Sequence, residues 1–222
     1  SIIALSVPNI ATADEAGKFK VGALYNYEDH RNNETGESTY ANFSGFLLGY
    51  EKMYDSFWWS IDGKYRFGRL GNEKGYANLA DIYGQAVVGM TYDVSGFMLK
   101  PFVGLGASWE DQDMHKAMDV YFTEYVLPIG MRVERNTSMG LFGVDLQYGY
   151  VLRREMYGTD FDGYWGSRNF DGSYNVEVGL YHEHATLPIG VRASFKYERW
   201  QTSKYWYQLE REHLGVETYV KF

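Results

Sequence analysis

The segment His213-Leu-Gly-Val-Glu-Thr-Tyr-Val-Lys-Phe222 closes the chain, and its residues alternate between two kinds of side chain. Every second position, from Leu214 to Phe222, is apolar or carries a threonine. The positions between them include the polar residues His213, Glu217 and Lys221. Because successive side chains of a β-strand point to opposite faces, this alternation predicts a strand with one apolar and one polar face.

The same period of two continues through the chain from Lys18 onward. Short connections alternate with longer and more polar ones, which lie at about 30–38, 70–79, 110–121, 154–173 and 201–206. This organisation predicts an all-β fold, an up-and-down antiparallel β-barrel of ten strands; an eight-stranded barrel is the alternative. Pro128 falls inside its predicted strand, where the missing N–H is poorly tolerated. The ten strands are expected at about 18–29, 39–53, 57–69, 80–93, 97–109, 122–135, 140–153, 174–184, 188–200 and 207–222.

The composition bounds the class of protein. The 222 residues contain no cysteine, which excludes disulfides, thiol catalysis and cysteine-ligated metals. The formal net charge of −8 and the lack of a basic stripe argue against a nucleic-acid partner. Aromatic residues make up 18% of the chain, a content typical of the aromatic girdles of membrane barrels. The sequence contains no run of about 18 apolar residues, so it predicts no membrane-spanning helix.

A final strand that ends in phenylalanine resembles the sorting signal of bacterial outer-membrane β-barrels as a class. Gly215 and Phe222 fit this signal, whereas Thr218 stands where an aromatic residue is often found. The resemblance covers about residues 18–222. It implies an integral protein of the bacterial outer membrane, surrounded by membrane lipid and lipopolysaccharide and inserted by the barrel assembly machinery. An even number of strands then places both termini on the periplasmic side.

The N-terminal residues have a different character. Residues 1–13 are mostly apolar and end in Ala11-Thr12-Ala13, a small-x-small pattern typical of signal-peptide cleavage sites. We expect residues 1–16 to be a signal-peptide remnant or an N-terminal arm. Residues 17–222 are expected to form the transmembrane barrel.

The polar face of the predicted strands carries charges of both signs in nearly equal numbers. In a membrane barrel this face points into the lumen, where opposite charges can pair away from bulk water. In a soluble barrel, which is the alternative, the same face would point to solvent. We predict a lumen charge network that comprises Asp62, Lys64, Arg66, Asp81, Lys100, Glu124, Arg132, Glu134, Asp145, Arg153, Glu177, Arg192, Lys196, Glu198 and Glu217.

The longest connection, 154–173, contains the candidate contact residues. Aromatic and arginine side chains dominate binding hot spots, and aspartates offer oxygen ligands for calcium, although the full calcium-loop pattern is absent. We expect this connection to contact an extracellular or envelope protein. The candidates are Asp160, Asp162, Tyr164, Trp165, Arg168 and Asp171.

Catalytic and metal-binding patterns are weak in this sequence. His182 and His184 share one face of a strand but have no third ligand nearby in sequence. A rim protease would need aspartates and a histidine on facing loops, for which the candidates are Asp160, Asp162, His30 and His115. No Gly-x-Ser-x-Gly pattern occurs. We therefore predict no catalytic residue, no metal site and no cofactor.

These patterns favour a non-enzymatic outer-membrane barrel that acts as a surface-exposed structural or interaction protein, similar to an adhesin. The first alternative is a narrow, porin-like channel for ions or small solutes. The second is a hydrolase at the barrel rim, either a protease or a lipid-modifying enzyme.

Overall fold

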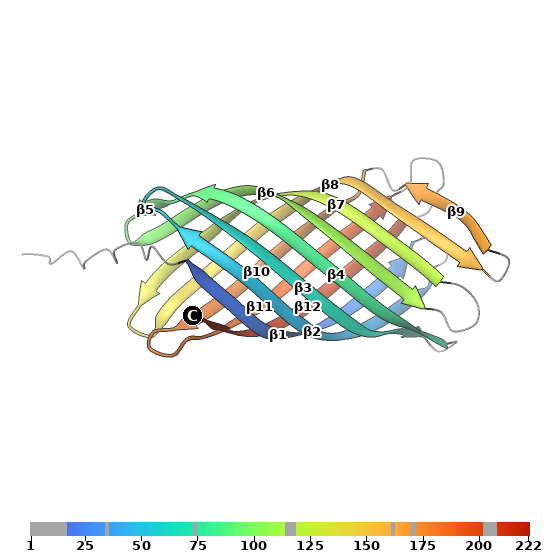
Figure 1. Cartoon of the computed structure of the whole chain (residues 1–222), viewed down its shortest axis with the longest axis horizontal. Coiled ribbons are helices and arrows are strands. Elements are labelled where there is room, and N and C mark those ends of the chain that lie inside the picture. Colours follow the sequence, from blue (N-terminus) through green and yellow to red (C-terminus); the bar gives the residue numbers. More distant parts are fainter. Residues whose placement is uncertain are drawn as a thin grey trace, which may run out of the picture.

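The computed structural model describes residues 17–33, 36–72, 75–113, 119–160, 163–169, 172–201 and 208–222. Their strands form one antiparallel sheet that closes on itself into a barrel (Figure 1). The strands are β1 (Lys18–Asn32), β2 (Ser38–Met53), β3 (Phe57–Asn72), β4 (Gly75–Met90), β5 (Tyr92–Val94), β6 (Phe97–Asp113), β7 (Asp119–Thr137), β8 (Gly140–Asp160), β9 (Gly163–Asn169), β10 (Tyr174–His184), β11 (Ile189–Gln201) and β12 (Gln208–Lys221).

Ten of these strands make the barrel wall, which confirms the ten-stranded prediction over the eight-stranded one. Strand β5 follows β4 and pairs with β6, and β9 folds back onto the outer end of β8. The wall closes where β8 meets β10 and where β12 meets β1. Phe19 and Phe222 exchange two backbone hydrogen bonds of 2.8 and 3.0 Å at this second seam. The expectation for residues 1–16 falls outside the described residues.

The barrel has two ends that differ in their connections. One end is called the turn rim here. It holds the start of β1, the end of β12 and the turns at 54–56, 95–96, 138–139 and 185–188. The opposite end, which holds the long connections, is called the loop rim. Strand ends at the turn rim match the predicted ones within one residue for β1, β2, β3, β6, β8 and β10.

At the loop rim most strands extend beyond their predicted ends, whereas β10 starts where predicted and β12 starts one residue later. Strand β8 continues to Asp160, and β9 turns 163–169 back against it, so part of the predicted loop 154–173 is a hairpin. These strand ends pair by backbone hydrogen bonds but rise above the apolar band of the wall. Because neither lipid nor an apolar core faces them, their sequence carries no alternation that could reveal a strand.

Rows of hydrogen-bonded neighbours climb obliquely around the wall. A row that starts at Lys52 on β2 returns to β2 at Tyr40, a shift of 12 residues toward the loop rim. Such a stagger requires the strands to tilt relative to the barrel axis, typically by about 35–45°. A row that crosses from β2 toward β8 therefore rises from the turn rim to the loop rim.

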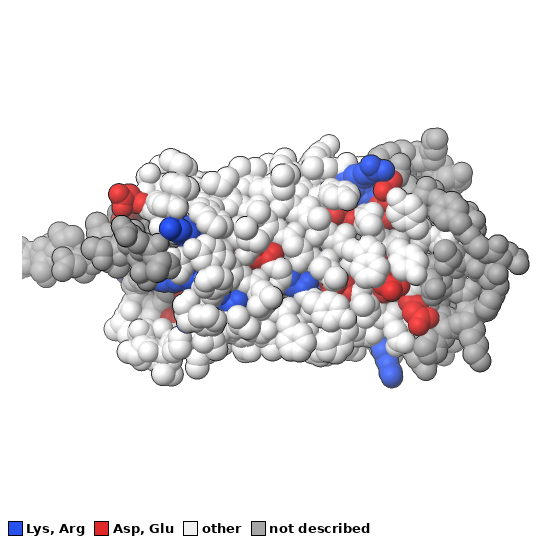
Figure 2. Space-filling model, in the orientation of Figure 1, with Lys and Arg blue, Asp and Glu red and all other residues white. Residues whose placement is uncertain are grey.

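The outer face of the wall is apolar. In Figure 2 uncharged atoms cover most of the middle of the barrel, and most of the visible charges lie toward its two ends. On β8 every second residue from Phe142 to Leu152 is apolar and exposed. This span of 11 residues is what a tilted strand needs to cross a bilayer.

A β-bulge in β8 changes the direction of one predicted lumen residue. Tyr125 pairs with Arg153 and Val126 with Val151, so Leu152 has no opposite residue on β7. The extra residue turns Arg153 to the outside, where 63% of its side chain is exposed, and turns Arg154 inward. The prediction of Arg153 in the lumen was wrong for this reason. Close by, the ladder between β6 and β7 has a gap opposite Pro128.

Candidate functional site

The candidate site is the lumen of the barrel, into which most of the predicted charged side chains point. Every residue of the predicted lumen network except Arg153 lies on the inner side of the wall. These side chains come from eight strands, because each strand sends every second residue inward. Charges withdrawn from water are costly unless they are paired, and the lumen pairs them in three layers.

Glu28 on β1 is the centre of the layer nearest the loop rim. Its carboxylate is fully buried and lies 2.5 Å from Arg66, 2.6 Å from Nδ1 of His213 and 3.0 Å from Nε2 of His30. Arg66 also lies 2.7 Å from Asp81. One carboxylate on β1 thereby joins side chains from β3 and β12, and through Arg66 from β4.

Trp200 on β11 lies between two guanidinium groups in the same layer. Arg211 and Arg154 lie 3.9 and 4.0 Å from the centre of its ring. Arg211 makes a two-pronged contact with Glu110, at 2.7 and 3.0 Å, across the barrel. The indole Nε1 donates to Glu198 at 3.0 Å. Cations on aromatic faces gain most where water is excluded, as it is here.

The middle layer is built around Arg192. Its Nη2 atom lies 2.8 Å from Asp145 and 2.7 Å from Glu177, and its Nη1 lies 3.5 Å from Glu217. Lys64 reaches Glu217 from β3 at 2.6 Å. This layer therefore links β3, β8, β10, β11 and β12 through the centre of the lumen.

The third layer lies toward the turn rim. Lys100 approaches Glu134 at 3.0 Å, and Arg132 approaches Glu51 at 2.7 Å. The guanidinium of Arg132 also covers the ring of Trp58 at 4.7 Å. Nearer the rim, three further pairs are partly exposed: Lys20 with Asp62, Lys221 with Glu183, and Tyr219 with Glu183.

Two small cavities remain between these layers. One of about 100 Å³ lies toward the turn rim, and one of about 70 Å³ lies toward the loop rim. Lys64, Tyr83 and Glu177 line both cavities and so form the constriction between them. Cavities of this size are large enough to hold ordered water molecules.

Several lumen residues were not among the predicted network. Glu110 and Arg154 lie beyond the predicted strand ends, and Glu51 lies near the end of its strand. Arg211 lies within the predicted strand 207–222, and the alternation could have identified it, because it shares a face with His213 and Glu217. Trp58 could not be found in this way, because a large apolar side chain is expected on the lipid face.

The other candidate positions lie elsewhere. His30 was expected on a rim loop but is buried inside the barrel on β1 against Glu28, a correction that removes it from the rim. His182 stacks on Phe142, and His184 accepts backbone hydrogen bonds from Thr186 and Leu187. His115, Asp162 and Asp171 fall outside the described residues. Of Asp160, Tyr164, Trp165 and Arg168 the structure describes only the backbone.

The described residues contain neither a candidate metal cluster nor a candidate membrane-spanning helix. No group of three or more histidine, cysteine, aspartate or glutamate side chains in them could hold a metal ion. The described part of the chain also contains no helix long and apolar enough to cross a membrane.

Comparison with known proteins identifies the fold. No family model and no curated protein matches the chain. Among solved structures, the outer membrane protease OmpT from Escherichia coli is similar over 96% of this chain and 99% of its own, with a TM-score of 0.58 and 9% identity. The chain has the fold of a bacterial outer-membrane β-barrel. The likeness to OmpT concerns this fold alone.

Other outer-membrane barrels resemble the chain less closely. The translocator domain of the autotransporter NalP from Neisseria meningitidis matches 91% of this chain and 88% of its own, with a TM-score of 0.49 and 9% identity. An outer membrane channel from Pseudomonas putida F1 matches 97% and 99%, with a TM-score of 0.45 and 11% identity. An outer-membrane barrel implies a lipid environment around the apolar wall.

Proposed function

We propose that this outer-membrane barrel is a non-conducting and non-enzymatic anchor that presents its loop-rim strands to an extracellular or envelope protein. In this proposal both termini are periplasmic, the loop rim faces outward, and the barrel assembly machinery inserts the chain among lipid and lipopolysaccharide. The single observation that carries the proposal is the filled lumen: in the part of the chain that the structure describes, paired side chains narrow it to two small cavities that meet at Lys64, Tyr83 and Glu177.

The ion pairs also brace the barrel. Lys64 and Glu217 join β3 to β12, Arg132 and Glu51 join β7 to β2, and Arg211 and Glu110 join β12 to β6. These strands are not neighbours in the wall, so each pair resists flattening of the barrel. A braced barrel holds the loop-rim strands in fixed positions, which lowers the entropic cost of binding a partner.

The presented surface would centre on the outer ends of β7, β8 and β9. Strand β9 pairs with β8 at residues 155–160, so the hairpin rises above the apolar span that ends at Leu152. It contains the proposed contact residues Tyr164, Trp165 and Arg168. Replacing residues 161–171 with a short glycine-serine turn should abolish partner binding and leave the barrel folded.

Solute flux through proteoliposomes tests the proposal. Wild-type barrels should give no swelling in isotonic solutions of small sugars or salts, because the side chains of Lys64, Tyr83 and Glu177 narrow the lumen between the two cavities. Swelling at the rate of an open porin would refute the non-conducting anchor. Heat-modifiable migration in gels provides the control for folding.

A narrow channel is the second candidate, and one observation favours it. Only the constriction of Lys64, Tyr83 and Glu177 separates the two cavities in the described lumen, so movement of these side chains would join them. A rim hydrolase is the third candidate. Hydrolysis that survives replacement of Asp160, Asp162 and His115 together would exclude the protease arrangement.

A further inference from the structure

The lipid-facing wall contains a groove across β3, β4 and β6. Its floor is one row of hydrogen-bonded neighbours, in which Gly63 pairs with Gly84 and Gly84 pairs with Ala107. Leu48 on β2 and Tyr125 on β7 continue this row on either side. Small residues thus replace the large side chains that cover the wall elsewhere.

The groove exists because these glycines lack side chains on the outer face. A Cβ atom built on Gly63 or Gly84 would come no closer than 3.9 or 3.8 Å to another atom. At the inward-facing Gly45, by contrast, a Cβ atom would lie 2.0 Å from the carbonyl oxygen of Tyr65. Gly63 and Gly84 are therefore not required by close packing, and larger residues would fit there.

Apolar side chains form the sides of the groove. Ile61, Ala86 and Leu105 flank the row toward the turn rim, and Ile82 flanks it toward the loop rim. The space has a volume of about 1060 Å³. Pockets for organic ligands commonly measure about 300–1,000 Å³, so the groove is large enough for a hydrocarbon chain.

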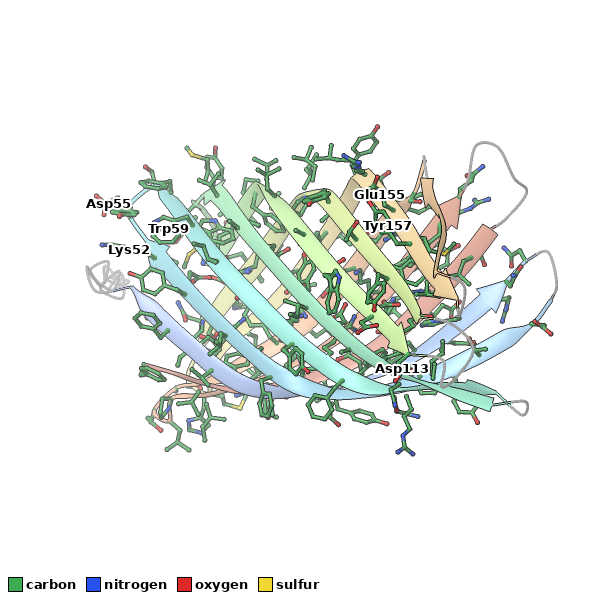
Figure 3. The ribbon with its side chains drawn as sticks, turned by 45° about the vertical axis from the view of Figure 1, so that its right-hand side comes forward. Lys52, Asp55, Trp59, Asp113, Glu155 and Tyr157 are labelled. Carbon is green, nitrogen blue, oxygen red and sulfur yellow. The ribbon has the colours of Figure 1, made fainter. Side chains whose placement is uncertain are left out.

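A cation stands at the loop-rim end of the same row. Tyr125 pairs with Arg153, which the bulge at Leu152 turns to the outside. Arg153 donates from Nη2 to Glu155 at 2.6 Å, and Glu155 also accepts from the Tyr157 hydroxyl at 2.7 Å. Figure 3 shows Glu155 and Tyr157 near the outer part of β8. Since a guanidinium has five N–H donors, Arg153 held by Glu155 retains donors for an anion.

We propose that this groove binds one acyl chain of lipid A, the phosphorylated outer-leaflet lipid of lipopolysaccharide, and that Arg153 binds its phosphate. Arginine is well suited to phosphate, which it can contact with two parallel hydrogen bonds. The inference rests on the orientation in the proposed function, because Arg153 must lie at the outer leaflet.

The dimensions fit an acyl chain. Gly63 and Arg153 are four strand intervals apart, which at about 4.8 Å each gives about 19 Å. One leaflet of the hydrocarbon core is about 15 Å thick, and an oblique row of 19 Å descends through most of it. A second barrel is a poorer occupant, since a symmetric contact centred on two concave grooves would enclose a void.

Lipid retention tests this proposal. Barrels refolded into phosphatidylcholine vesicles containing diphosphoryl lipid A are extracted in mild detergent, and native mass spectrometry counts the lipid A that stays bound. Wild type should retain one molecule. Gly84→Leu, which fills the floor, should lower retention about tenfold, the equivalent of ~1.4 kcal/mol. The matched control is Ala193→Leu, which places the same leucine side chain on the lipid face of β11.

Charge variants locate the headgroup. Arg153→Gln should lower retention about tenfold, whereas Lys52→Gln, at the turn-rim end of the groove, should leave it unchanged. Equal retention in wild type and Gly84→Leu would overturn the groove, and a loss with Lys52→Gln in place of Arg153→Gln would overturn the headgroup assignment. Equal retention of phosphatidylglycerol would overturn the choice of lipid A.

The proposed function fails by a different route. Labelling of a cysteine at Gly36 on intact cells reports whether the loop rim faces outward. Labelling that requires permeabilised cells would contradict the orientation and, with it, the lipid A assignment. Labelling of intact cells together with equal retention in wild type and Gly84→Leu would overturn the lipid A proposal alone.

Discussion

The charged side chains at the two ends of the lumen differ in how far they are exposed to water. Near the loop rim, the charged side chains are almost completely buried: 3% of the Arg211 side chain is exposed, and Glu28 is fully buried. At the turn rim, 21% of Lys221 and 19% of its partner Glu183 are exposed. Bulk water can therefore stabilise a turn-rim charge that loses its partner more readily than it can stabilise a loop-rim charge.

This difference means that the loss of a charge partner should be more costly in the loop-rim layer than among the turn-rim pairs. A buried pair contributes little net stability compared with apolar side chains, yet breaking it leaves an uncompensated charge. A partly exposed pair contributes about 0–1 kcal/mol and is screened by salt.

The largest effect is expected for Arg211→Met. Loss of the guanidinium leaves Glu110 buried without its two-pronged partner, which should lower the free energy of unfolding by about 3–5 kcal/mol. Urea unfolding in lipid vesicles, followed by tryptophan fluorescence, measures this change. A loss below about 1 kcal/mol would mean that water reaches the loop-rim layer.

The double variant Arg211→Met with Glu110→Leu should recover most of that loss. Apolar side chains in place of a buried ion pair are often neutral or stabilising. The same unfolding assay should place the double variant within about 1 kcal/mol of wild type. A double variant as unstable as Arg211→Met would show that Glu110 supports other parts of the layer.

Trp200→Leu should have an intermediate effect. Arg154 and Arg211 lose the aromatic ring between them, and the smaller side chain leaves space. The expected destabilisation is about 2–4 kcal/mol, combining lost cation–π contacts and lost packing. Tyr148→Leu, on the lipid face, is the control and should cost less than about 1 kcal/mol because the replacement remains apolar.

The smallest effect is expected for Lys221→Met at the turn rim. Glu183 keeps its hydrogen bond from the Tyr219 hydroxyl and is partly exposed. The free energy of unfolding should fall by about 0–1 kcal/mol, and this loss should become smaller still at high salt. A loss as large as that of Arg211→Met would remove the distinction between the two ends.

Sequence reasoning predicted the wall better than the loop rim. Alternation located the ten strands and the inner face, because lipid on one side and paired charges on the other impose a period of two. It failed at Arg153, since one extra residue at Leu152 reverses the side of every residue that follows. The β8–β9 hairpin carries no such pattern, so it was predicted as a loop.

The pairing partners of the lumen charges could not be predicted either. Lys64 and Glu217 are 153 positions apart in the chain and meet only because the barrel closes with a shift of 12 residues. The lipid-face groove was missed for a related reason. Gly63, Gly84 and Ala107 become neighbours only when the register is known.

Single-channel recording in planar bilayers tests the sealed lumen most directly. Wild type should give no current steps, whereas Tyr83→Ala, which removes the ring between the two cavities, should give small reproducible steps. Tyr148→Ala removes an outward-facing tyrosine and should stay silent. Reproducible steps from wild-type barrels, at the level of Tyr83→Ala, would contradict the claim that paired side chains close the lumen.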